Sequence, residues 1–332
     1  MRPIERWSEN ELADAVVRGD PRALAKVISA IEDETPRGRE ILDLLYRHTG
    51  RAYRVGLTGP PGSGKSTLTD LLARQIRAGG ETVAVLAVDP SSPFSGGAIL
   101  GDRIRMQTAA ADPGVFIRSM ASRGSLGGLA AATEQAAEAL DAAGFDWVLI
   151  ETVGVGQSEM EVVGVADTTL LVLVPESGDG VQVMKAGLME AGDIFVINKY
   201  DREGGDRIQK EIQLLLSVLH DRWPKDAWLP PIVPTVAIRE QGGAELLAEI
   251  RRHRVTSDER SSLDRRRQRT REQVSVLVRA RFGKETWERM DLDARIESEL
   301  DRVIAREISP YRLAETWTNE LAERLGGKRR EA

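Results

Sequence analysis

Residues 59–66 have the residue types and spacing of a phosphate-binding loop, because they read G-P-P-G-S-G-K-S. Glycines allow such a loop to turn its backbone N–H groups inward around a phosphate, and the helix that follows adds partial positive charge. Lys65 can reach the β and γ oxygens of a triphosphate, and the Ser66 hydroxyl can hold Mg²⁺. We therefore expect a nucleoside triphosphate to contact Gly59, Pro61, Gly62, Ser63, Gly64, Lys65, Ser66 and Thr67.

A second motif, Asn198-Lys199-Tyr200-Asp201, directly follows an apolar run and indicates which base is bound. A carboxylate at Asp201 can accept hydrogen bonds from N1–H and the 2-amino group of guanine, and Asn198 can reach the N7/O6 side. The aliphatic part of Lys199 can cover the base. Adenine lacks this pair of donors, so a buried acceptor would go unsatisfied. Three residues after a later apolar run are expected to close over the base through their backbone: Val236, Ala237 and Ile238.

Two further groups of residues could contact Mg²⁺ or the γ-phosphate. Glu151 ends an apolar run, where nucleotide hydrolases place an acid linked to Mg²⁺, and Gly154 can offer its N–H to the γ-phosphate. Glu151 could equally be a simple charge at the end of a strand. Gln157 could orient the attacking water. Asp89 and Asp102 could reach Mg²⁺ directly or through water, although Asp89 precedes a proline and turn chemistry is an alternative.

The elements that must position these residues alternate between strands and helices from about residue 51 to 255, as in a mostly parallel sheet with helices on both faces. The predicted strands are Tyr53–Thr58, Thr82–Val88, Val115–Arg118, Trp147–Ile150, Thr169–Val174, Ile194–Asn198 and Ile232–Thr235. The predicted helices of this region are Lys65–Ala78, Ala130–Ala142, Gln182–Glu190, Arg207–Leu219 and Ala244–Arg254.

Helical extensions are expected on both sides of this P-loop domain, over residues 1–50 and 256–332. Capping-box spacing begins at Ser8, and Asp20-Pro21 has the pattern of a second helix start. An apolar stripe in the last extension fits either packing on the main domain or a homodimer arm, of which we favour the arm. The stripe consists of Leu292, Ile296, Leu300, Val303, Ile304 and Ile308.

Composition excludes several other classes of protein. The 332 residues carry a net charge of −6, which argues against general binding to nucleic acid or membrane surfaces. The chain has no cysteine, and its three histidines lie far apart, so neither disulfides nor a His/Cys metal cluster is expected. No apolar run reaches the roughly 18 residues of a membrane span, and the N-terminus lacks the apolar core of a signal peptide. We expect a cytoplasmic protein.

These motifs together resemble the MeaB/ArgK family of P-loop GTPases, relatives of the human methylmalonic aciduria type A protein. The resemblance covers almost the whole chain, and the run E-T-V-G-V-G-Q-S-E is more specific to the family than the phosphate loop. The matching segments are residues 59–66, 87–92, 96–102, 151–159 and 198–201.

The resemblance implies a GTP-dependent chaperone that gates cofactor loading and protects an adenosylcobalamin-dependent acyl-CoA mutase. It further implies a homodimer formed through C-terminal helical arms, and GTP or GDP with Mg²⁺ as ligands. The Mg²⁺ site of the family would fall on Ser66, Asp89, Asp102 and Glu151. A mobile segment that couples the family's G domain to the mutase would include Gly178, Asp179, Gln182 and Lys185.

The expected reaction is in-line attack of water on the γ-phosphate of GTP, with Lys65, Mg²⁺ and the loop amides stabilising the developing charge. Gly154 would sense loss of the γ-phosphate. The sequence reveals no evident arginine finger, so we expect slow turnover that a partner accelerates. The alternatives are a P-loop kinase, including the amino-acid transport kinases that share the family label, and a GTPase that inserts a different metallocofactor. The latter often carry His/Cys-rich tracts, which this chain lacks.

Overall fold

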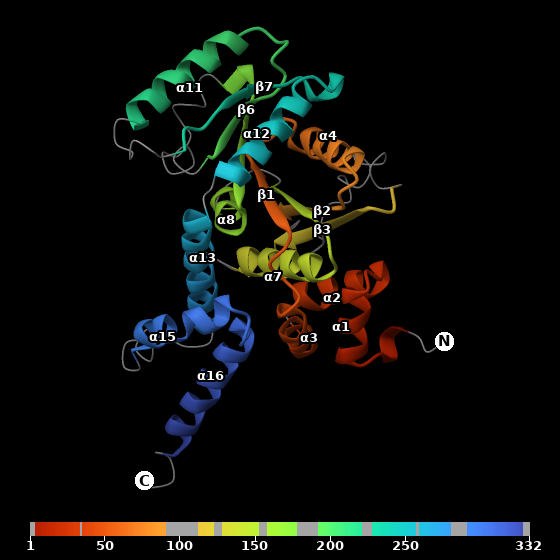
Figure 1. Cartoon of the computed structure of the whole chain (residues 1–332), viewed down its shortest axis with the longest axis vertical. Coiled ribbons are helices and arrows are strands. Elements are labelled where there is room, and N and C mark those ends of the chain that lie inside the picture. The colour runs from red at the N-terminus through yellow and green to blue at the C-terminus, as the bar shows by residue number, and fades with distance from the viewer. Residues whose placement is uncertain are drawn as a thin grey trace. The chain divides into compact units, whose positions relative to one another are not determined.

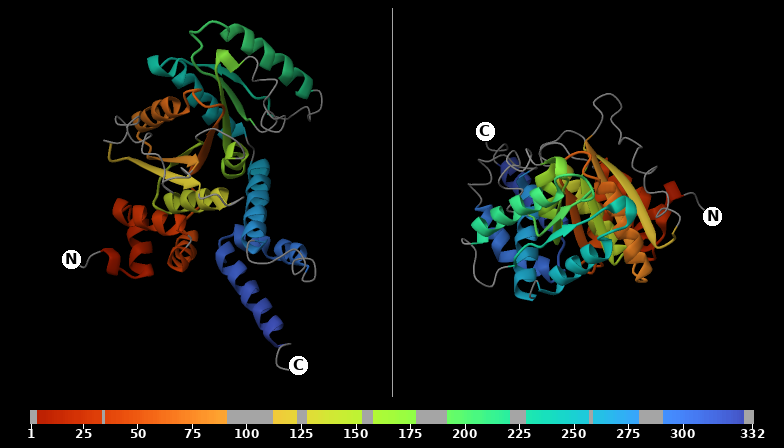
Figure 2. Two further views of the ribbon diagram at one scale, coloured as in Figure 1. Left: turned by 180° about the vertical axis from the view of Figure 1, so that it is seen from behind. Right: turned by 90° about the horizontal axis from the view of Figure 1, so that it is seen from above.

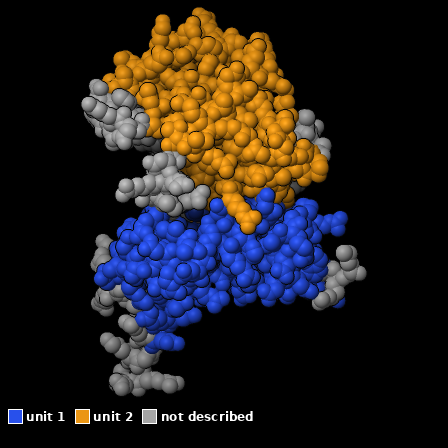
Figure 3. Space-filling view, viewed as in Figure 1, with its two compact units in different colours: residues 1–50, 134–144, 259–332 blue, residues 51–133, 145–258 orange. Residues whose placement is uncertain are grey.

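The chain folds into two compact units in a computed structural model (Figure 3). The first unit comprises residues 1–50, 134–144 and 259–332, and the second comprises residues 51–133 and 145–258. The structure describes residues 4–33, 35–90, 112–122, 128–152, 158–177, 192–220, 228–256, 259–279 and 291–327.

A seven-stranded sheet forms the centre of the second unit, in the order β3-β2-β4-β1-β5-β6-β7. Every neighbouring pair in it is parallel. Its strands are β1 (Tyr53–Thr58), β2 (Val83–Pro90), β3 (Val115–Ser122), β4 (Trp147–Thr152), β5 (Thr168–Leu173), β6 (Ile194–Ile197) and β7 (Ile232–Pro234). The predicted α/β class and all seven predicted strands are therefore confirmed, with ends that differ by a few residues.

The middle strands explain why the sequence shows apolar runs rather than alternation. Every residue of β1, β4 and β5 is buried, because helices cover both faces of the sheet. The strand order places β1 between β4 and β5, so the loop that leaves the end of β1 starts in the middle of the sheet's carboxyl edge. This edge is where parallel α/β sheets bind ligands.

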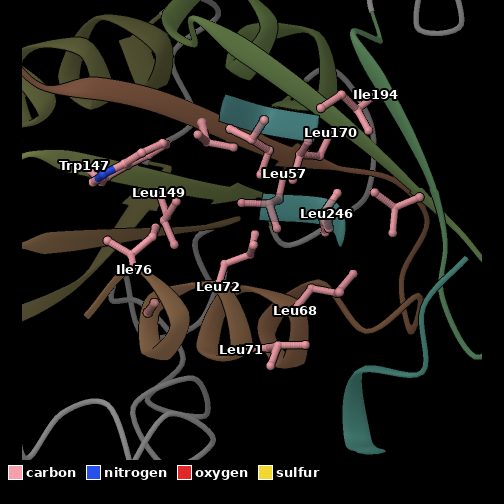
Figure 4. Close-up of a cluster of buried hydrophobic side chains, with 14 of the residues drawn as sticks. Leu57, Leu68, Leu71, Leu72, Ile76, Trp147, Leu149, Leu170, Ile194 and Leu246 are labelled. Atoms are coloured by element: carbon pink, nitrogen blue, oxygen red, sulfur yellow. The ribbon is translucent and has the colours of Figure 1, made fainter. Parts of the chain in front are cut away.

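Helices α4 (Lys65–Ala78) and α12 (Gly243–Thr256) pack on one face of the sheet. Figure 4 shows Leu68, Leu72 and Ile76 of α4 directed toward Leu57 and Leu149 of the strands. Helices α8 (Ser158–Val165) and α11 (Gly205–His220) contact the sheet as well, and α11 contributes Ile208, Ile212 and Leu216 to a second apolar cluster with β5 and β6. Figure 1 and Figure 2 show these helices around the strands.

The remaining elements of the second unit are short turns and one longer helix. These are η2 (Pro175–Ser177), η3 (Ala237–Arg239) and α7 (Gly128–Ala142), whose C-terminal half is counted in the first unit. The predicted helices Lys65–Ala78, Ala130–Ala142, Arg207–Leu219 and Ala244–Arg254 all correspond to observed helices. The predicted helix Gln182–Glu190 lies outside the described residues.

The N-terminal fifty residues are helical, as predicted, with α1 (Glu9–Val17), α2 (Pro21–Glu32) and α3 (Pro36–Tyr46) after a short turn, η1 (Ile4–Arg6). Ser8 and Glu11 form a reciprocal capping box at the start of α1. Asp20 caps α2 through its carboxylate, which accepts hydrogen bonds from two backbone N–H groups, and Pro21 occupies the first helical position.

The C-terminal part contains α13 (Glu259–Arg279), α15 (Leu292–Ile304) and α16 (Pro310–Gly327). The apolar stripe that we assigned to a dimer arm is already covered within one chain, because Leu292, Ile296, Leu300 and Val303 are buried. Helices α13 and α15 are in contact, and Val274 and Val278 of α13 are buried too. Four of the six stripe residues are therefore covered within one chain, and a dimer through this arm would use other residues. No helix within the described ranges is both long and apolar enough to cross a membrane.

Candidate nucleotide-binding site

The phosphate loop has a backbone that other residues would not adopt. Gly59, directly after β1, has a φ of 137°, and a Cβ added there would lie 2.1 Å from the carbonyl oxygen of Val172. Gly64 precedes α4 in the left-handed region with a φ of 88°. These glycines let the chain turn from the centre of the sheet directly into the helix, which aims the N-terminus of α4 at the loop.

Lys65 is held across this loop. Its Nζ donates hydrogen bonds to the carbonyl oxygens of Gly59, at 2.7 Å, and Pro60, at 3.1 Å. The residue is buried, and the two hydrogen bonds keep its ammonium group against the loop instead of extending it into solvent. A buried ammonium that is held by carbonyl oxygens is positioned for an anionic ligand of the loop.

Ser66 and Glu151 meet at the start of α4. The Ser66 hydroxyl donates a hydrogen bond to Glu151 Oε1, from the end of β4. Glu151 is 1% exposed, and its position in β4 is paired with Leu57 of β1, next to the start of the loop. A hydroxyl and a buried carboxylate are oxygen ligands of the kind that Mg²⁺ prefers. The two residues therefore fit the predicted metal site.

The other predicted metal, catalytic and coupling residues cannot be placed around this pair. Asp89 lies in β2, which neighbours β4, but its side chain is outside the described part of the structure. The metal candidate Asp102 and the catalytic candidates Gly154 and Gln157 lie outside the described residues. The predicted coupling residues also lie outside them: Gly178, Asp179, Gln182 and Lys185. Among the described residues, no group of three or more His, Asp or Glu side chains is arranged to hold a metal ion.

Asn198 joins the base-reading motif to the phosphate loop. Its Nδ2 donates to the carbonyl oxygen of Ser63 at 2.8 Å. Its Oδ1 accepts from the hydroxyl of Thr235 at 3.2 Å and from the backbone N–H of Ala237 at 3.1 Å. A side-chain amide carries two N–H donors, and the bond to Ser63 uses one of them. The buried amide thus connects three segments and fixes its own orientation.

Lys199 makes a second link between the same two motifs. It adopts a left-handed backbone with a φ of 56°, and its Nζ donates to the carbonyl oxygen of Gly62 at 2.7 Å. The aliphatic part of Lys199 therefore extends from the end of β6 toward the phosphate loop. Ile238 follows Ala237 and is 85% exposed, a position from which an apolar side chain can cover a planar base.

Asp201 forms an ion pair that the sequence did not predict. Its Oδ2 lies 3.3 Å from Nη2 of Arg239, the residue directly after Ile238. Thr235 is a second residue that we missed, although it directly precedes the predicted loop. Neither has a sequence signal of its own, because an arginine and a threonine in a loop are most often solvated residues. Their roles depend on the packing of β7 beside β6.

All the described residues of the two motifs lie at one end of the sheet. The phosphate loop follows β1, Glu151 is the second-last residue of β4, the Asn198 motif follows β6, and the loop that begins at Val236 follows β7. Because parallel strands present their carboxyl ends on one edge, residues far apart in sequence converge there. The arrangement provides a phosphate cradle, a pair of oxygen ligands for a cation and a set of hydrogen-bonding groups for a planar base.

Comparison with known proteins is consistent with this site. A family model described as "Methylmalonyl Co-A mutase-associated GTPase MeaB" matches residues 24–291. A relative from Pyrococcus abyssi, which bears a provisional GTPase name, is 47% identical over 319 residues, or 96% of this chain and 97% of that protein. The GTPase ArgK of Escherichia coli is 37% identical over 72% of this chain and 75% of its own length.

A mitochondrial protein of Mus musculus named as a methylmalonic aciduria type A homolog is 36% identical over 71% of this chain and 61% of its own length. Among solved structures, one titled as an LAO/AO transport system kinase superposes with a TM-score of 0.68 at 27% identity. The superposition covers 95% of this chain and 97% of the chain in that solved structure. From its motifs, its parallel sheet and these matches, the chain belongs to the MeaB family of methylmalonyl Co-A mutase-associated GTPases.

Proposed function

We propose that this GTPase binds guanine nucleotide in the site formed by the phosphate loop and the Asn198–Asp201 motif. The observation that carries the proposal is the pair of hydrogen bonds from Asn198 to Ser63 and from Lys199 to Gly62. They tie the base-reading residues to the loop that would hold the phosphates, so one ligand spanning both is accommodated. A nucleoside triphosphate has a base and a phosphate chain at this kind of separation.

Guanine is selected by the donors it offers to Asp201. The N1–H and the 2-amino group both point to one edge of the base, where a carboxylate can accept from both. An adenine at the same place would present an acceptor at N1, and the Asp201 carboxylate would lose its partners. Such a mismatch of polar groups discriminates more strongly than a change in apolar contact does.

Different residues would have distinct roles in hydrolysis of the γ-phosphate. Lys65 and the loop amides would bind the β and γ oxygens and stabilise their negative charge. Ser66 and Glu151, with Asp89 and Asp102, would hold Mg²⁺, which when bound neutralises charge on the β and γ oxygens. Gly154 and Gln157 would sense the γ-phosphate and orient water, respectively.

The client of the GTPase would be an adenosylcobalamin-dependent acyl-CoA mutase of the methylmalonyl-CoA type. Support comes from the family description, which names association with that mutase. The GTPase would load and protect the mutase as a homodimer through its C-terminal arm, and the segment with Gly178, Asp179, Gln182 and Lys185 would couple the two proteins. Intrinsic hydrolysis would be slow, and the mutase would accelerate it.

One experiment tests both the GTPase activity and its coupling to the mutase. Phosphate release from GTP is measured for the isolated protein and again with increasing methylmalonyl-CoA mutase, while light scattering reports the mass of the free protein and of the complex. We expect slow release that rises with mutase, and a mass of two chains for the free protein. Fast release by the isolated protein, or a rate that the mutase leaves unchanged, would contradict the chaperone role.

A kinase is a second candidate, because the superposable solved structure is titled as a transport system kinase. A kinase of small molecules or proteins would transfer the γ-phosphate to an acceptor rather than to water. Such a transfer does not require that Asp201 recognise the hydrogen-bond donors of guanine. Incubation with labelled GTP or ATP and candidate amino-acid transport proteins would detect a phosphorylated product, which the GTPase assignment does not predict.

A further inference from the structure

The six residues from Val236 to Gln241, here called the base loop, form a closed turn. Backbone hydrogen bonds join Val236 and Gln241 in both directions, at 3.1 and 3.3 Å. Inside the loop, the N–H of Arg239 donates to Val236 and that of Glu240 donates to Ala237. Few backbone torsions of this loop can change without breaking one of these bonds. Side chains that leave it therefore start from a fixed position.

Gly242 shows how closely the base loop returns to its own start. Its φ is 76°, and a Cβ added there would lie 2.3 Å from the carbonyl oxygen of Pro234 in β7. This contact anchors the end of the loop to the strand that precedes it. The loop is thus held at its base by both backbone pairing and close packing.

Two consecutive side chains of the base loop form ion pairs with two different elements. Arg239 pairs with Asp201 of the base-reading motif at 3.3 Å. Glu240, which adopts a left-handed backbone with a φ of 59°, pairs with Arg74 of α4 at 2.5 Å. Arg74 also pairs with Asp70 one turn earlier at 3.0 Å. The hydrogen bond that the Arg74 guanidinium donates to Glu240, together with the one that it donates to Asp70, raises the pKa of Arg74 despite its partial burial.

These pairs connect the base loop to both halves of the candidate site. Helix α4 starts at the phosphate loop, so the Glu240–Arg74 pair fixes the base loop relative to the phosphate cradle. The backbone of Ala237 meets Asn198, while Arg239 meets Asp201. The same rigid loop therefore contacts both side chains that would read the base.

We propose that Arg239 is a positioning residue for guanine specificity, which holds the Asp201 carboxylate in the orientation that accepts both guanine donors. The inference rests on the proposed function, because it requires that Asp201 reads the base. A carboxylate has about four lone-pair positions on its two oxygens. Arg239 makes one contact, to Oδ2, which leaves acceptor positions on both oxygens for N1–H and the 2-amino group.

Asp201 needs such a restraint because its side chain is about one-third exposed, at 33%. An exposed aspartate samples several rotamers, and only an orientation with both oxygens toward the base serves both donors. Loss of the restraint should weaken the hydrogen bond from the 2-amino group of guanine more than the hydrogen bond from N1–H. The 2-amino group distinguishes guanine from hypoxanthine, the base of inosine nucleotides.

The test compares GDP with IDP, because IDP lacks the 2-amino group and shares the phosphates. Dissociation constants for both are measured by titration calorimetry on the full chain with Mg²⁺, for the native protein, Arg239→Gln and Arg239→Lys. We expect Arg239→Gln to lower the ratio of GDP to IDP affinity about two- to fivefold, the range of an exposed ion pair. Arg239→Lys should restore part of the ratio, and 1 M salt should reduce the difference between variants because exposed pairs are screened.

A matched control is Arg207→Gln, which removes the same charge from a pair with Glu211 on α11, at 2.9 Å. It should leave both affinities unchanged. An unchanged ratio in Arg239→Gln would overturn the positioning role. An increase in GDP affinity would also overturn it, since Arg239 would then compete with the base for Asp201.

Failure of the proposed function gives a different result. If the native protein binds ADP as tightly as GDP, or if Asp201→Ala leaves the preference for guanine intact, base reading by Asp201 is wrong and the inference falls with it. If Asp201→Ala abolishes the preference while Arg239→Gln changes nothing, only the role of Arg239 is wrong.

Discussion

The side chain of Asn198 donates a hydrogen bond from Nδ2 to the carbonyl oxygen of Ser63, at 2.8 Å and across 135 residues of sequence. Ser63 lies inside the phosphate loop and Asn198 follows β6, and both are buried. Gly64 adjoins the same contact, because a Cβ added to it would lie 2.3 Å from Asn198 Nδ2. The phosphate cradle and the base-reading motif are thus assembled around one amide group.

Removing this amide should destabilise the nucleotide-free protein. Asn198→Ala leaves three polar groups without their partner, namely Ser63 O, Thr235 Oγ1 and Ala237 N. We expect the free energy of unfolding to fall by about 3 kcal/mol, since each buried unsatisfied group costs about 1–3 kcal/mol and water will reach some of them. Urea unfolding measures this change.

The control for Asn198→Ala is Lys199→Gln, which removes the more exposed bond to Gly62. It should change the free energy of unfolding by no more than about 0.5 kcal/mol. Equal losses in the two variants would contradict the central structural role of Asn198.

Replacement of Glu151 tests whether its carboxylate holds the metal or is a strand-end charge. Glu151→Gln keeps the size of the buried side chain but removes its negative charge beside Ser66. The Mg²⁺ concentration for half-maximal GTP hydrolysis should rise about 10- to 100-fold, the usual effect of altering a metal's surroundings. GDP binding in EDTA should be unaffected.

Glu176→Gln is the matched control for Glu151, because it removes a carboxylate from an exposed pair with Arg202. Its Mg²⁺ dependence should equal that of the native protein. If Glu151→Gln also keeps the native Mg²⁺ dependence, Glu151 is only a charge at the end of β4.

The sequence predicted the elements of this fold because buried parallel strands require nearly continuous apolar runs. The prediction of β1 as Tyr53–Thr58 and α4 as Lys65–Ala78 agrees with the structure at both ends. Strand order could not be read in the same way, because a run such as Ile194–Ile197 is apolar whichever strand lies beside it. Only the folded structure shows that β6 lies between β5 and β7.

The residues of the candidate site also fall into those that local sequence could indicate and those that it could not. The residues proposed to contact the ligand directly lie in local motifs, so Lys65 and Asn198 could be proposed from spacing alone. Residues that orient them come from other segments, so Thr235 and Arg239 had no local signal. The apolar stripe with Leu292 and Ile296 has a related limit, because amphipathic spacing shows that a face is buried without showing which surface buries it.

Two glycines of the phosphate loop should respond differently to alanine. At Gly59 a Cβ meets the Val172 carbonyl oxygen at 2.1 Å with a φ of 137°, whereas at Gly62 nothing lies within 4 Å and φ is 74°. Gly59→Ala should therefore lower the free energy of unfolding by about 3 kcal/mol or more, from strain and overpacking together. Gly62→Ala should cost only the backbone strain of about 1 kcal/mol. Thermal and urea unfolding of both variants provide the comparison, and equal losses would contradict the geometry of the loop.

Stability at high pH should depend on Tyr311 in the first unit. Burial, together with the Glu138 carboxylate to which the hydroxyl donates a hydrogen bond, raises the pKa of Tyr311 well above its usual value. The folded state then keeps this proton above pH about 10, where an unfolded tyrosine loses it. The free energy of unfolding must therefore decrease as the pH rises beyond that point, by at most about 1.4 kcal/mol per pH unit for one proton.

Tyr311→Phe removes this ionisable group. Urea unfolding between pH 8 and 11 should show a shallower decrease above pH 10 for the variant than for the native protein, even though the variant is less stable at neutral pH. Identical slopes would mean that Tyr311 titrates alike in the folded and unfolded states.

The most direct test of guanine binding at Asp201 is titration calorimetry of GDP, ADP and XDP against the native protein and Asp201→Asn. Xanthine carries an oxygen where guanine carries the 2-amino group, so an asparagine amide can donate to it. The native protein should bind GDP at least about a hundredfold more tightly than ADP, and Asp201→Asn should lose GDP affinity and gain affinity for XDP. ADP bound as tightly as GDP, or an Asp201→Asn variant with unchanged preference, would contradict the account.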